Sequence, residues 1–421
     1  MSVLQSSQRL STRPAPSFGV DRLRALARCW VAVAALVYLL DLTRQTAVGL
    51  SDGAGRPLGD DFINYWSGAA LAWGSDAGDV YAWAAFHAFE QAATGGVIGF
   101  YHYSYPPALL VLTAPLAALP YVPALALWLS GSWLAFYRAL AAAWPQSQRS
   151  DVLLLAAATP AVFLNFIAGQ NGAWSAALIG GGLVLLDRRP VLAGLLFGLM
   201  VCKPHLALLV PVALIAGHRW QALAVAAATT GGIVVISIVL FGADIWPTDL
   251  EHVAVLRQTV LESGAGVWHR MASVFVTARH SGADITTAYA IQAFCATIAA
   301  AAVGWLWHRD APAEQRNAAL VLGGFLAAPY LQDYDLVIGA FAVVWIMQMA
   351  ANGAMTRRAG AVASALVLMT PAVVAPVAKA TGVAVGAPAL GAAFAMIALA
   401  SLPVREMLAG LWRRPHAVDD L

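Results

Sequence analysis

Apolar and polar positions are arranged along this chain in long blocks rather than in short alternation. The first apolar block covers about residues 26–46, and further blocks follow one another from residue 106 onwards. A helix that crosses a bilayer needs about twenty apolar residues, whereas a barrel strand alternates over about ten. The blocks therefore predict transmembrane helices.

We expect about twelve spans, with a margin of one or two because several blocks are short. They lie at 26–46, 121–143, 151–167, 170–186, 190–202, 204–216, 220–241, 284–307, 316–331, 334–350, 359–377 and 384–402. The block from Pro106 to Trp144 is too long for one span. Pro115 and Pro120 interrupt it, which predicts a short re-entrant or tilted segment at 106–120. Residues 190–216 could instead form one kinked element.

The composition agrees with this pattern. Hydrophobic residues make up 60% of the 421 positions, charged residues 11%, and the mean hydropathy is +0.71. Soluble domains are about half apolar and about a quarter charged, so the sequence predicts an all-α polytopic membrane protein. Cys29, Cys202 and Cys295 are far apart, which indicates neither a disulfide framework nor a metal cluster.

Basic residues gather on one side of the predicted spans. Arginines precede the first block, which places its N-terminal side in the cytoplasm. The later basic positions on that side are Arg138, Arg149, Arg188, Arg189, Arg219, Arg309, Arg316, Arg357, Arg358, Arg405, Arg413 and Arg414. Both termini are therefore expected in the cytoplasm, and the protein in the inner (plasma) membrane. External loops are expected at about 49–105 and 242–283.

The same pattern predicts one transmembrane domain over residues 21–405. It is expected to carry a disordered cytoplasmic tail at 1–20 and a cytoplasmic tail at 406–421.

Two adjacent acids, Asp60 and Asp61, open the stretch DDFINYWSGAALAW in the first external loop. Phe62, Trp66 and Trp73 recur there at helical spacing, which predicts an amphipathic helix in the membrane interface. Asp60 would be its N-cap, and Asp61 would lie in its first turn. Two capping residues on a solvated loop explain the pair. Alternatively, one carboxylate could accept a proton from an acceptor hydroxyl.

Polar residues also mark three other external positions. Tyr105 ends the stretch YHYSY, which an aromatic belt at the membrane surface would explain. Gln170 and Asn171 lie in AGQNGAW, either as a plain hairpin turn or as amides that bind a sugar. Asp333 and Asp335 lie in QDYDL, where they could cap a helix or line a polar cavity.

A lysine interrupts the apolar block at 190–216. Lys203 precedes Pro204, which breaks a helix, and His205 follows. A lysine within a membrane segment costs a few kcal/mol, so it either extends to the interface or faces a polar cavity. A cation at a helix break suits an anionic group such as a phosphate.

Another basic pair lies in VWHRMASVF of the second external loop. Trp268, Met271 and Phe275 keep helical spacing, which predicts a second interfacial helix. His269 and Arg270 beside this stripe are either solvated charges or partners for a phosphate. The spacing alone favours neither.

The order of these motifs resembles glycosyltransferase family 87, whose members are polyprenyl-phosphate-dependent mannosyltransferases and their relatives. The motifs are DDFINYW, YSYPPALLVLTAPLAALPY, GQNG, RRPVLAGLLFGLMVCKPHLALLVPVAL, WHRMASVF and QDYDL, within residues 25–350. The resemblance implies a C-type glycosyltransferase fold with a catalytic carboxylate in the first external loop. It also implies a lipid-phosphate-sugar donor, with mannose as the commonest sugar of the family.

The family motifs correspond to individual positions here. The Asp-Phe motif falls on Asp61 and the Tyr-Pro-Pro motif on Tyr105. The Lys-Pro motif falls on Lys203 and the Tyr-Asp-Leu motif on Asp335. Many members have a histidine at the position of Tyr330. Its absence leaves any proton-relay role there to His102, His205 or His269.

The resemblance and the topology together give an expected mechanism. Asp61 is the base of an inverting sugar transfer to a lipid or glycan hydroxyl on the periplasmic (external) face. The donor phosphate is expected to contact Lys203, His205, His269 and Arg270. The sugar and acceptor are expected to contact Asp60, Tyr105, Gln170, Asn171 and Asp335. A lipid phosphate is already a competent leaving group, so no metal and no cofactor are expected, and no nucleic acid is expected as a partner.

Two points stay open at the level of sequence. A helix N-terminus lowers the pKa of a carboxylate, so Asp61 is expected to be a weak base that accepts its proton late. About twelve spans with a broken helix and an internal lysine also fit a secondary transporter or a lipid-linked-sugar flippase. The lack of an internal repeat and the two large external loops argue against a transporter.

Overall fold

A computed structural model describes residues 18–74, 77–144, 147–264 and 266–400. Within these residues the chain is mostly helical, and its only extended pairings are isolated bridges. Most of the expected N-terminal tail and the whole expected tail at 406–421 lie outside the described residues. The all-α prediction is confirmed for the part of the chain that the structure describes.

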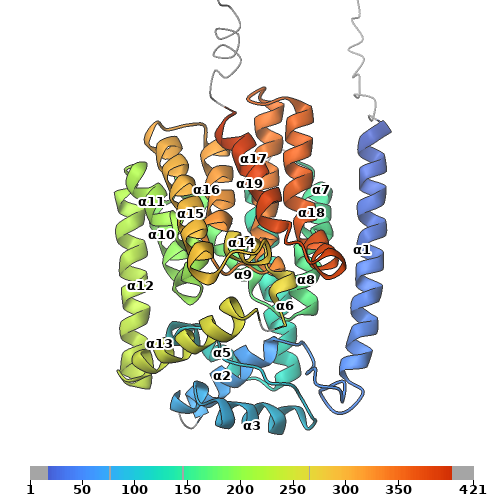
Figure 1. Ribbon diagram of the computed structural model, residues 1–421, viewed down its shortest axis with the longest axis vertical. Coiled ribbons are helices and arrows are strands. Elements are labelled where there is room, and N and C mark those ends of the chain that lie inside the picture. The colour runs from blue at the N-terminus through green and yellow to red at the C-terminus, as the bar shows by residue number, and fades with distance from the viewer. Residues whose placement is uncertain (1–17, 75–76, 145–146, 265, 401–421) are drawn as a thin grey trace, which may run out of the picture.

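The first helix, α1 (Phe18–Gln45), stands along one side of the molecule (Figure 1). The first long loop follows it and forms a layer of short helices at the far end of α1 (Figure 1). We call these elements the loop layer: α2 (Phe62–Gly74), η1 (Ala77–Val80), α3 (Trp83–Thr94), α4 (Pro107–Leu112) and α5 (Ala114–Ala117). The segment predicted at 106–120 is thus a pair of short helices.

Most of the remaining chain forms a helical bundle. Its first part contains α6 (Tyr121–Ala143), α7 (Arg149–Ala158), α8 (Pro160–Ile167), α9 (Gly172–Leu185), α10 (Pro190–Gly198), η2 (Leu199–Cys202), η3 (Pro204–Ala207), α11 (Leu209–Ala216) and α12 (Trp220–Phe241). Its second part contains α15 (Ile285–His308), α16 (Ala313–Ala327), η6 (Asp333–Ile338), α17 (Gly339–Ala351), α18 (Arg357–Thr381) and α19 (Gly386–Ala398).

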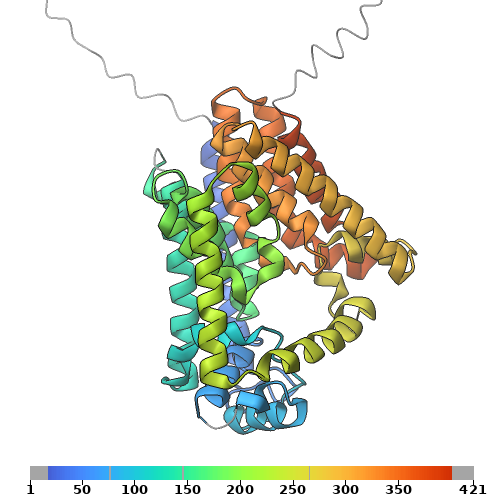
Figure 2. The ribbon, with the colours of Figure 1, turned by 90° about the vertical axis from the view of Figure 1, so that its left-hand side faces the viewer.

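The second long loop connects the two parts. It contains α13 (Ile245–Leu256), η4 (Arg257–Glu262), η5 (Trp268–Arg270) and α14 (Val274–His280). Figure 2 shows α13 leaving the end of α12 beside the loop layer and running towards the second part of the bundle. This loop therefore bridges the loop layer and the bundle.

Five described helices are long and apolar enough to cross a membrane. They are Gly19–Gln45, Trp220–Phe241, Ile285–His308, Asp333–Ala351 and Arg357–Thr381. A sixth candidate is α7 with α8, which are bent by 55° at the break before Pro160, where the missing N–H interrupts the helical hydrogen bonds. The described chain is therefore a membrane protein. Four further apolar helices are shorter than a full span, so the count of twelve spans stays a prediction.

Two of the apolar cores, one in the loop layer and one in the bundle, meet at α6. In the loop layer, Phe62 is fully buried against Tyr121 and Trp128 of α6, with ring centroids 5.3 and 6.3 Å apart. In the bundle, the ring of Phe341 on α17 packs against Gly180 of α9, where a side chain would collide with it. Because α6 takes part in both cores, it fixes the loop layer relative to the bundle.

The two predicted interfacial helices differ from expectation. In α2, Phe62 and Ala69 are fully buried, so most of its apolar stripe packs inside the loop layer, and Trp73 near the end of the helix is 45% exposed. Asp60 does not cap it, because the Asp60 carboxylate is bound by Arg56 and Tyr101 instead. The predicted helix is thus confirmed as α2 and the prediction of Asp60 as its N-cap was wrong, while its place in the membrane interface stays a prediction.

The helix predicted around Trp268 to Phe275 is broken. Residues 268–270 form a single 3-10 turn, and α14 begins only at Val274, capped by Ser273. Between them Met271 bridges to Gln332, and Ala272 N donates to the Leu331 carbonyl at 2.8 Å. These pairings with a distant segment replace the helical hydrogen bonds that the local spacing had suggested.

Candidate active site

Asp61 ends a tight turn immediately before α2. Gly59 and Asp60 both have positive φ angles, 76° and 51°, so the chain reverses sharply just before the carboxylate. Non-glycine residues seldom adopt that region, and Asn and Asp tolerate it best. The Asp61 side chain is partly accessible, and its Oδ2 accepts a hydrogen bond from Gln170 Nε2 at 2.7 Å. The turn therefore presents one carboxylate to the bundle.

Gln170 is oriented by two tyrosines. Its Oε1 accepts from the Tyr65 hydroxyl at 2.7 Å and from the Tyr105 hydroxyl at 3.2 Å, and these two hydroxyls lie 2.5 Å apart. With the oxygen engaged by two donors, the amide nitrogen faces Asp61. The spacing of α2 gave no sign that Tyr65 would join this network, because Tyr65 resembles an ordinary membrane-interface tyrosine.

The turn around Gln170 needs glycine on both sides. Gly169 has a φ of 59°, and a side chain there would collide with the Gly59 carbonyl and with Phe62. At Gly172 a side chain would collide with the Tyr334 carbonyl. The expected close turn at 168–172 is confirmed, and it brings the chain against both the Asp61 turn and η6.

Asp60 belongs to a separate ion-pair network. Its carboxylate lies 3.1 Å from Arg56 and accepts from the Tyr101 hydroxyl at 2.6 Å. Arg56 also pairs with Asp41 of α1 at 3.1 Å, and Gln45 of α1 accepts from Gly59 N at 2.7 Å. Asp60 therefore attaches the turn to α1, and both oxygens of its carboxylate already have hydrogen-bond donors.

Lys203 lies at the break between η2 and η3, inside the bundle. It is 3% exposed, and its Nζ donates to Asp335 Oδ1 at 2.5 Å and to Asn171 Oδ1 at 2.8 Å. The other Asp335 oxygen accepts from Gln332 N at 3.0 Å. The three predicted residues Lys203, Asn171 and Asp335 are thus brought together, but as partners of one another rather than as free groups.

Arg270 forms a second ion pair beside the first. Its Nε and Nη2 donate to the two oxygens of Asp333, both at 2.9 Å. The Tyr334 ring is close to both cations, with its centroid 5.1 Å from Lys203 Nζ and 5.5 Å from the Arg270 guanidinium carbon. The Arg270 side chain is 26% exposed whereas the Asp333 side chain is 1% exposed, so only the cation of this pair is partly accessible. The pairing of Asp333 with Arg270 was not predicted.

The two candidate histidines differ in position. His205 has its Nε2 buried without a partner among the described residues, and its ring centroid lies 6.0 Å from that of Tyr330. His269 adjoins Arg270 in η5 and is partly accessible. Burial lowers the pKa of His269, and Lys379 and Arg270 lower it further. Near neutral pH His269 is therefore an uncharged ring, with one N–H that can donate to an anionic group.

The electrostatic setting of Asp61 corrects the expectation of a weak base. Burial raises the pKa of Asp61 to about 6, and the nearby Asp60 charge adds to this rise. The Gln170 hydrogen bond and the positive charges of Arg270 and Lys203 act in the opposite direction. Desolvation outweighs these groups, so Asp61 is a stronger base than an ordinary aspartate.

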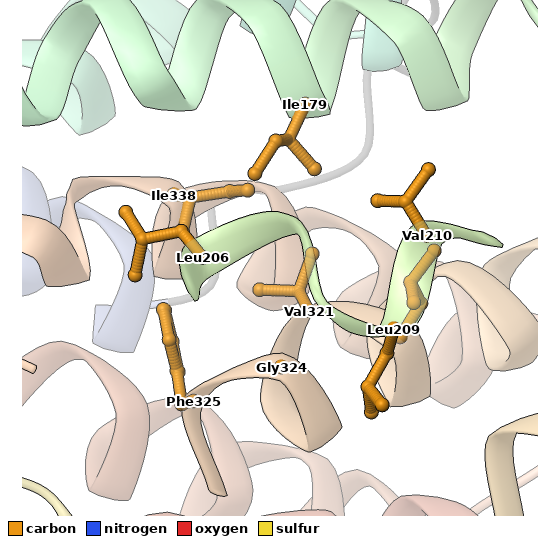
Figure 3. A pocket seen from close by; sticks show the side chains of 9 residues that line it. Ile179, Leu206, Leu209, Val210, Val321, Gly324, Phe325 and Ile338 are labelled. Carbon is orange, nitrogen blue, oxygen red and sulfur yellow. The ribbon is translucent and has the colours of Figure 1, made fainter. Parts of the chain in front are cut away.

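The space behind the break at Lys203 is apolar and nearly closed. Figure 3 shows Leu206, Leu209 and Phe325 among the side chains that line it, and its volume is about 10 Å³. That is room for about one water molecule. Among the residues that the structure describes, no three His, Cys, Asp or Glu side chains are grouped as metal ligands.

Fold and site together define an α-helical membrane protein with a polar centre of carboxylates, amides and cations among apolar helices. The sequence model of glycosyltransferase family 87 matches residues 103–329, which is more than half of the chain. The chain belongs to this family, and it is a membrane glycosyltransferase. No curated protein and no solved structure matches it. Asp61 and Asp335 lie outside the matched residues. Membership of this family favours sugar transfer over the transporter and flippase alternatives.

Proposed function

We propose that this protein transfers a sugar, with mannose as the first candidate, from a polyprenyl-phosphate donor to a hydroxyl of a lipid or glycan acceptor, with inversion at the anomeric carbon. The observation that carries the proposal is the arrangement of Asp61. One partly accessible carboxylate is hydrogen-bonded by an oriented amide and lies within the electrostatic influence of Arg270 and Lys203. A base next to a site for an anionic leaving group is what this transfer requires.

In the proposed step, Asp61 accepts the proton of the acceptor hydroxyl. Its Oδ2 is engaged by Gln170, so Oδ1 is the oxygen that takes the proton. The acceptor oxygen forms a bond to the anomeric carbon from the side opposite the phosphate. The bond from that carbon to the phosphate oxygen breaks, and its electron pair leaves with the polyprenyl phosphate.

Arg270 is the proposed contact for the leaving phosphate. Asp333 engages its Nε and Nη2, which leaves Nη1 free to donate to a phosphate oxygen. His205 and His269 are further candidates for that contact. Two of the three ammonium N–H groups of Lys203 already donate to Asp335 and Asn171, and its side chain is only 3% exposed, so it is poorly placed to meet a phosphate. We therefore assign Lys203 to holding the Asn171 turn and η6 together.

The sugar and acceptor are proposed to lie between the Asp61 turn and the end of η6. Tyr105 and Asn171 offer a hydroxyl and an amide group there, whereas Gln170, Asp60 and Asp335 act through the partners they already hold. The side of the membrane follows from the positive-inside rule, which places this end outside and both termini in the cytoplasm.

The test is the variant Asp61→Asn, assayed for transfer from a labelled polyprenyl-phosphate sugar in membranes. Removal of a general base is expected to lower the rate at least about a hundredfold. Asp79→Asn, in η1 of the same loop, is the matched control and should retain full activity. Activity of Asp61→Asn near that of the unaltered protein would exclude Asp61 as the base. The anomeric configuration of the product, read by NMR, tests inversion separately.

A further inference from the structure

A groove separates α1 from α7 at the end of the molecule opposite to the loop layer. Its volume is about 790 Å³, in the range of pockets that hold one small organic ligand. It is lined by Asp21, Arg24, Arg28, Val31, Ala32, Ala35, Gln148, Ser150, Asp151, Leu153, Leu154 and Ala157. Figure 1 shows α1 standing beside the bundle rather than within it. The groove takes no part in the site described above.

The lining changes from polar to apolar along α1. Asp21, Arg24 and Arg28 line the part near the start of the helix, and Val31, Ala32 and Ala35 line the part further along. The rise of about 1.5 Å per residue places Ala35 about 10 Å deeper than Arg28. The residues from α7 follow the same order, with Ser150 and Asp151 before Leu154 and Ala157. This is the order of headgroup and acyl chain in a lipid.

One arginine that lines the groove, Arg28, has no acidic partner among the described residues. Arg24 donates to both oxygens of Asp151 at 2.9 Å and to Asp21 Oδ1 at 3.2 Å, so each of its three nitrogens already has an acid as partner. Arg28 has no hydrogen bond or ion pair within the described part of the chain, and it is exposed towards solvent or lipid. A single free guanidinium is complementary to the single negative charge of a phosphodiester.

One carboxylate oxygen in the groove is also free. Asp21 Oδ2 accepts no hydrogen bond from the described residues, and the Asp21 side chain is 54% exposed. Asp21 precedes Arg28 by two helical turns, so it lies further out along the groove, where the terminal group of a lipid headgroup would be. An acid at that position favours a cationic group and opposes a second negative charge.

The outer face of α1 is suited to lipid. Leu26 and Leu36 are 67% and 58% exposed, and only 6% of the most apolar 18-residue window of this helix is buried. Along α1, Trp30 contacts Phe163 within the length of the groove, and Tyr38 contacts Phe166 beyond Ala35, with ring centroids 5.8 and 6.1 Å apart. The contact of Tyr38 with Phe166 therefore lies past the inner end of the groove lining.

We propose that this groove binds one glycerophospholipid with an amine headgroup, with its phosphate on Arg28, its ammonium group near Asp21 and an acyl chain along Val31, Ala35 and Leu154. The bound lipid fills the space between α1 and α7 and fixes α1 against the bundle. The proposal does not depend on the sugar transfer.

Native mass spectrometry of the full-length protein tests the site. The protein is first exchanged into a mixture of phosphatidylethanolamine, phosphatidylcholine and phosphatidylglycerol and is then released from detergent. The unaltered protein should retain one phosphatidylethanolamine molecule, at about fivefold higher occupancy than phosphatidylglycerol. Arg28→Gln and the groove-filling Ala32→Trp should each lower that occupancy about fivefold. Arg44→Gln, at the other end of the same helix, is the control and should leave it unchanged.

The variant Asp21→Asn tests the contact of Asp21 with the ammonium group separately from the contact of Arg28 with the phosphate. It should reduce the preference for phosphatidylethanolamine over phosphatidylglycerol while lipid is still retained. Equal lipid occupancy in Arg28→Gln and Arg44→Gln would overturn the site, and so would displacement of the lipid by soluble glycerophosphoethanolamine, which has no acyl chain. Retention of phosphatidylglycerol as tightly as phosphatidylethanolamine would overturn the amine headgroup.

Discussion

Gln170 donates a hydrogen bond to Asp61 across 109 residues of sequence, with its amide nitrogen 2.7 Å from the carboxylate oxygen. Gln170 lies in a turn of the bundle and Asp61 lies in the loop layer, so this bond joins the two parts of the molecule. The two tyrosine hydroxyls on the other end of the amide allow only one orientation of it. Gln170 therefore acts as a positioning residue for the proposed base.

Gln170→Leu should lower the transfer rate about tenfold to about a hundredfold. A hydrogen bond to a charged group contributes about 1.5–3 kcal/mol, and leucine keeps most of the volume while it removes both ends of the amide. The amide also lowers the pKa of Asp61, so its loss should move the acid limb of the pH–rate profile to higher pH. The measurement is the rate of transfer against pH for both proteins.

Tyr105→Phe is the matched control for that variant. It removes the longer of the two hydroxyl contacts to Gln170, at 3.2 Å, and leaves the 2.7 Å contact from Tyr65 in place. The acid limb should stay where it is. A loss of rate in Gln170→Leu with an unshifted acid limb would mean that Gln170 contacts substrate rather than positioning Asp61.

The unaltered protein should itself show an acid limb near pH 6. Burial raises the pKa of Asp61 to about 6, and only the ionised carboxylate can accept the proton of the acceptor. The rate should therefore fall about tenfold for each pH unit below 6 and reach a plateau above about pH 7. Transfer measured from pH 4.5 to 8.5 at saturating donor checks this. A rate that is constant down to pH 5 would argue against Asp61 as the base.

Sequence predicted the members of the site better than their contacts. Asp61, Gln170, Lys203 and Asp335 stood out as polar groups in a chain this apolar, and the motifs of family 87 assigned Asp61, Lys203 and Asp335 to the expected site. Their roles in the reaction stay predictions. The pairing of Lys203 with Asp335 could not be predicted, because the two residues are 132 positions apart in sequence and no local pattern indicates that they meet. As a result, Lys203 was expected to be free for a phosphate.

Local periodicity failed where a distant segment supplied hydrogen bonds. The spacing of Trp268, Met271 and Phe275 is helical, yet Met271 pairs with Gln332 and the helix starts only afterwards. The pKa of Asp61 was misjudged for a similar reason. The helix-terminus argument considers only neighbouring residues, whereas the enclosure of Asp61 comes from segments distant in sequence.

Lys203→Met should destabilise the fold by about 3–5 kcal/mol. The substitution leaves the Asp335 carboxylate fully buried without its cation, which is the costly way to break a buried ion pair. The double variant Lys203→Met with Asp335→Leu removes both charges, so it should recover most of the lost stability. The measurement is the free energy of unfolding of the purified proteins in detergent.

The double variant also separates structure from catalysis. If Lys203 only holds the Asn171 turn against η6, the folded double variant should keep measurable transfer activity. If Lys203 contacts the donor phosphate, the double variant should be stable but should show a raised KM for the donor. A double variant no more stable than Lys203→Met would contradict the ion-pair argument.

At the opposite end of the bundle, Arg316 of α16 should show an asymmetric response to loss of its partners. The side chain is 7% exposed and donates to Asp187 at 2.6 Å and to Asp310 at 2.5 Å, whereas these two acids are 47% and 77% exposed. Asp187→Asn with Asp310→Asn leaves a buried guanidinium without an acid and should cost about 3–5 kcal/mol. Arg316→Met leaves two acids that water can solvate, so its cost should be lower, about 1–2 kcal/mol.

Asp187 follows α9 and Asp310 follows α15, whereas Arg316 lies in the first turns of α16, so their pairing holds the ends of these three helices together. Trp307 takes part as well, because its ring lies 5.1 Å from the guanidinium and its Nε1 donates to the Arg316 carbonyl at 3.1 Å. Chemical unfolding of both variants in the same detergent gives the comparison. Arg316→Met could lower the free energy of unfolding as much as the double acid variant does. That result would contradict the asymmetry, and it would show that Arg316 stabilises the fold mainly by packing on Trp307.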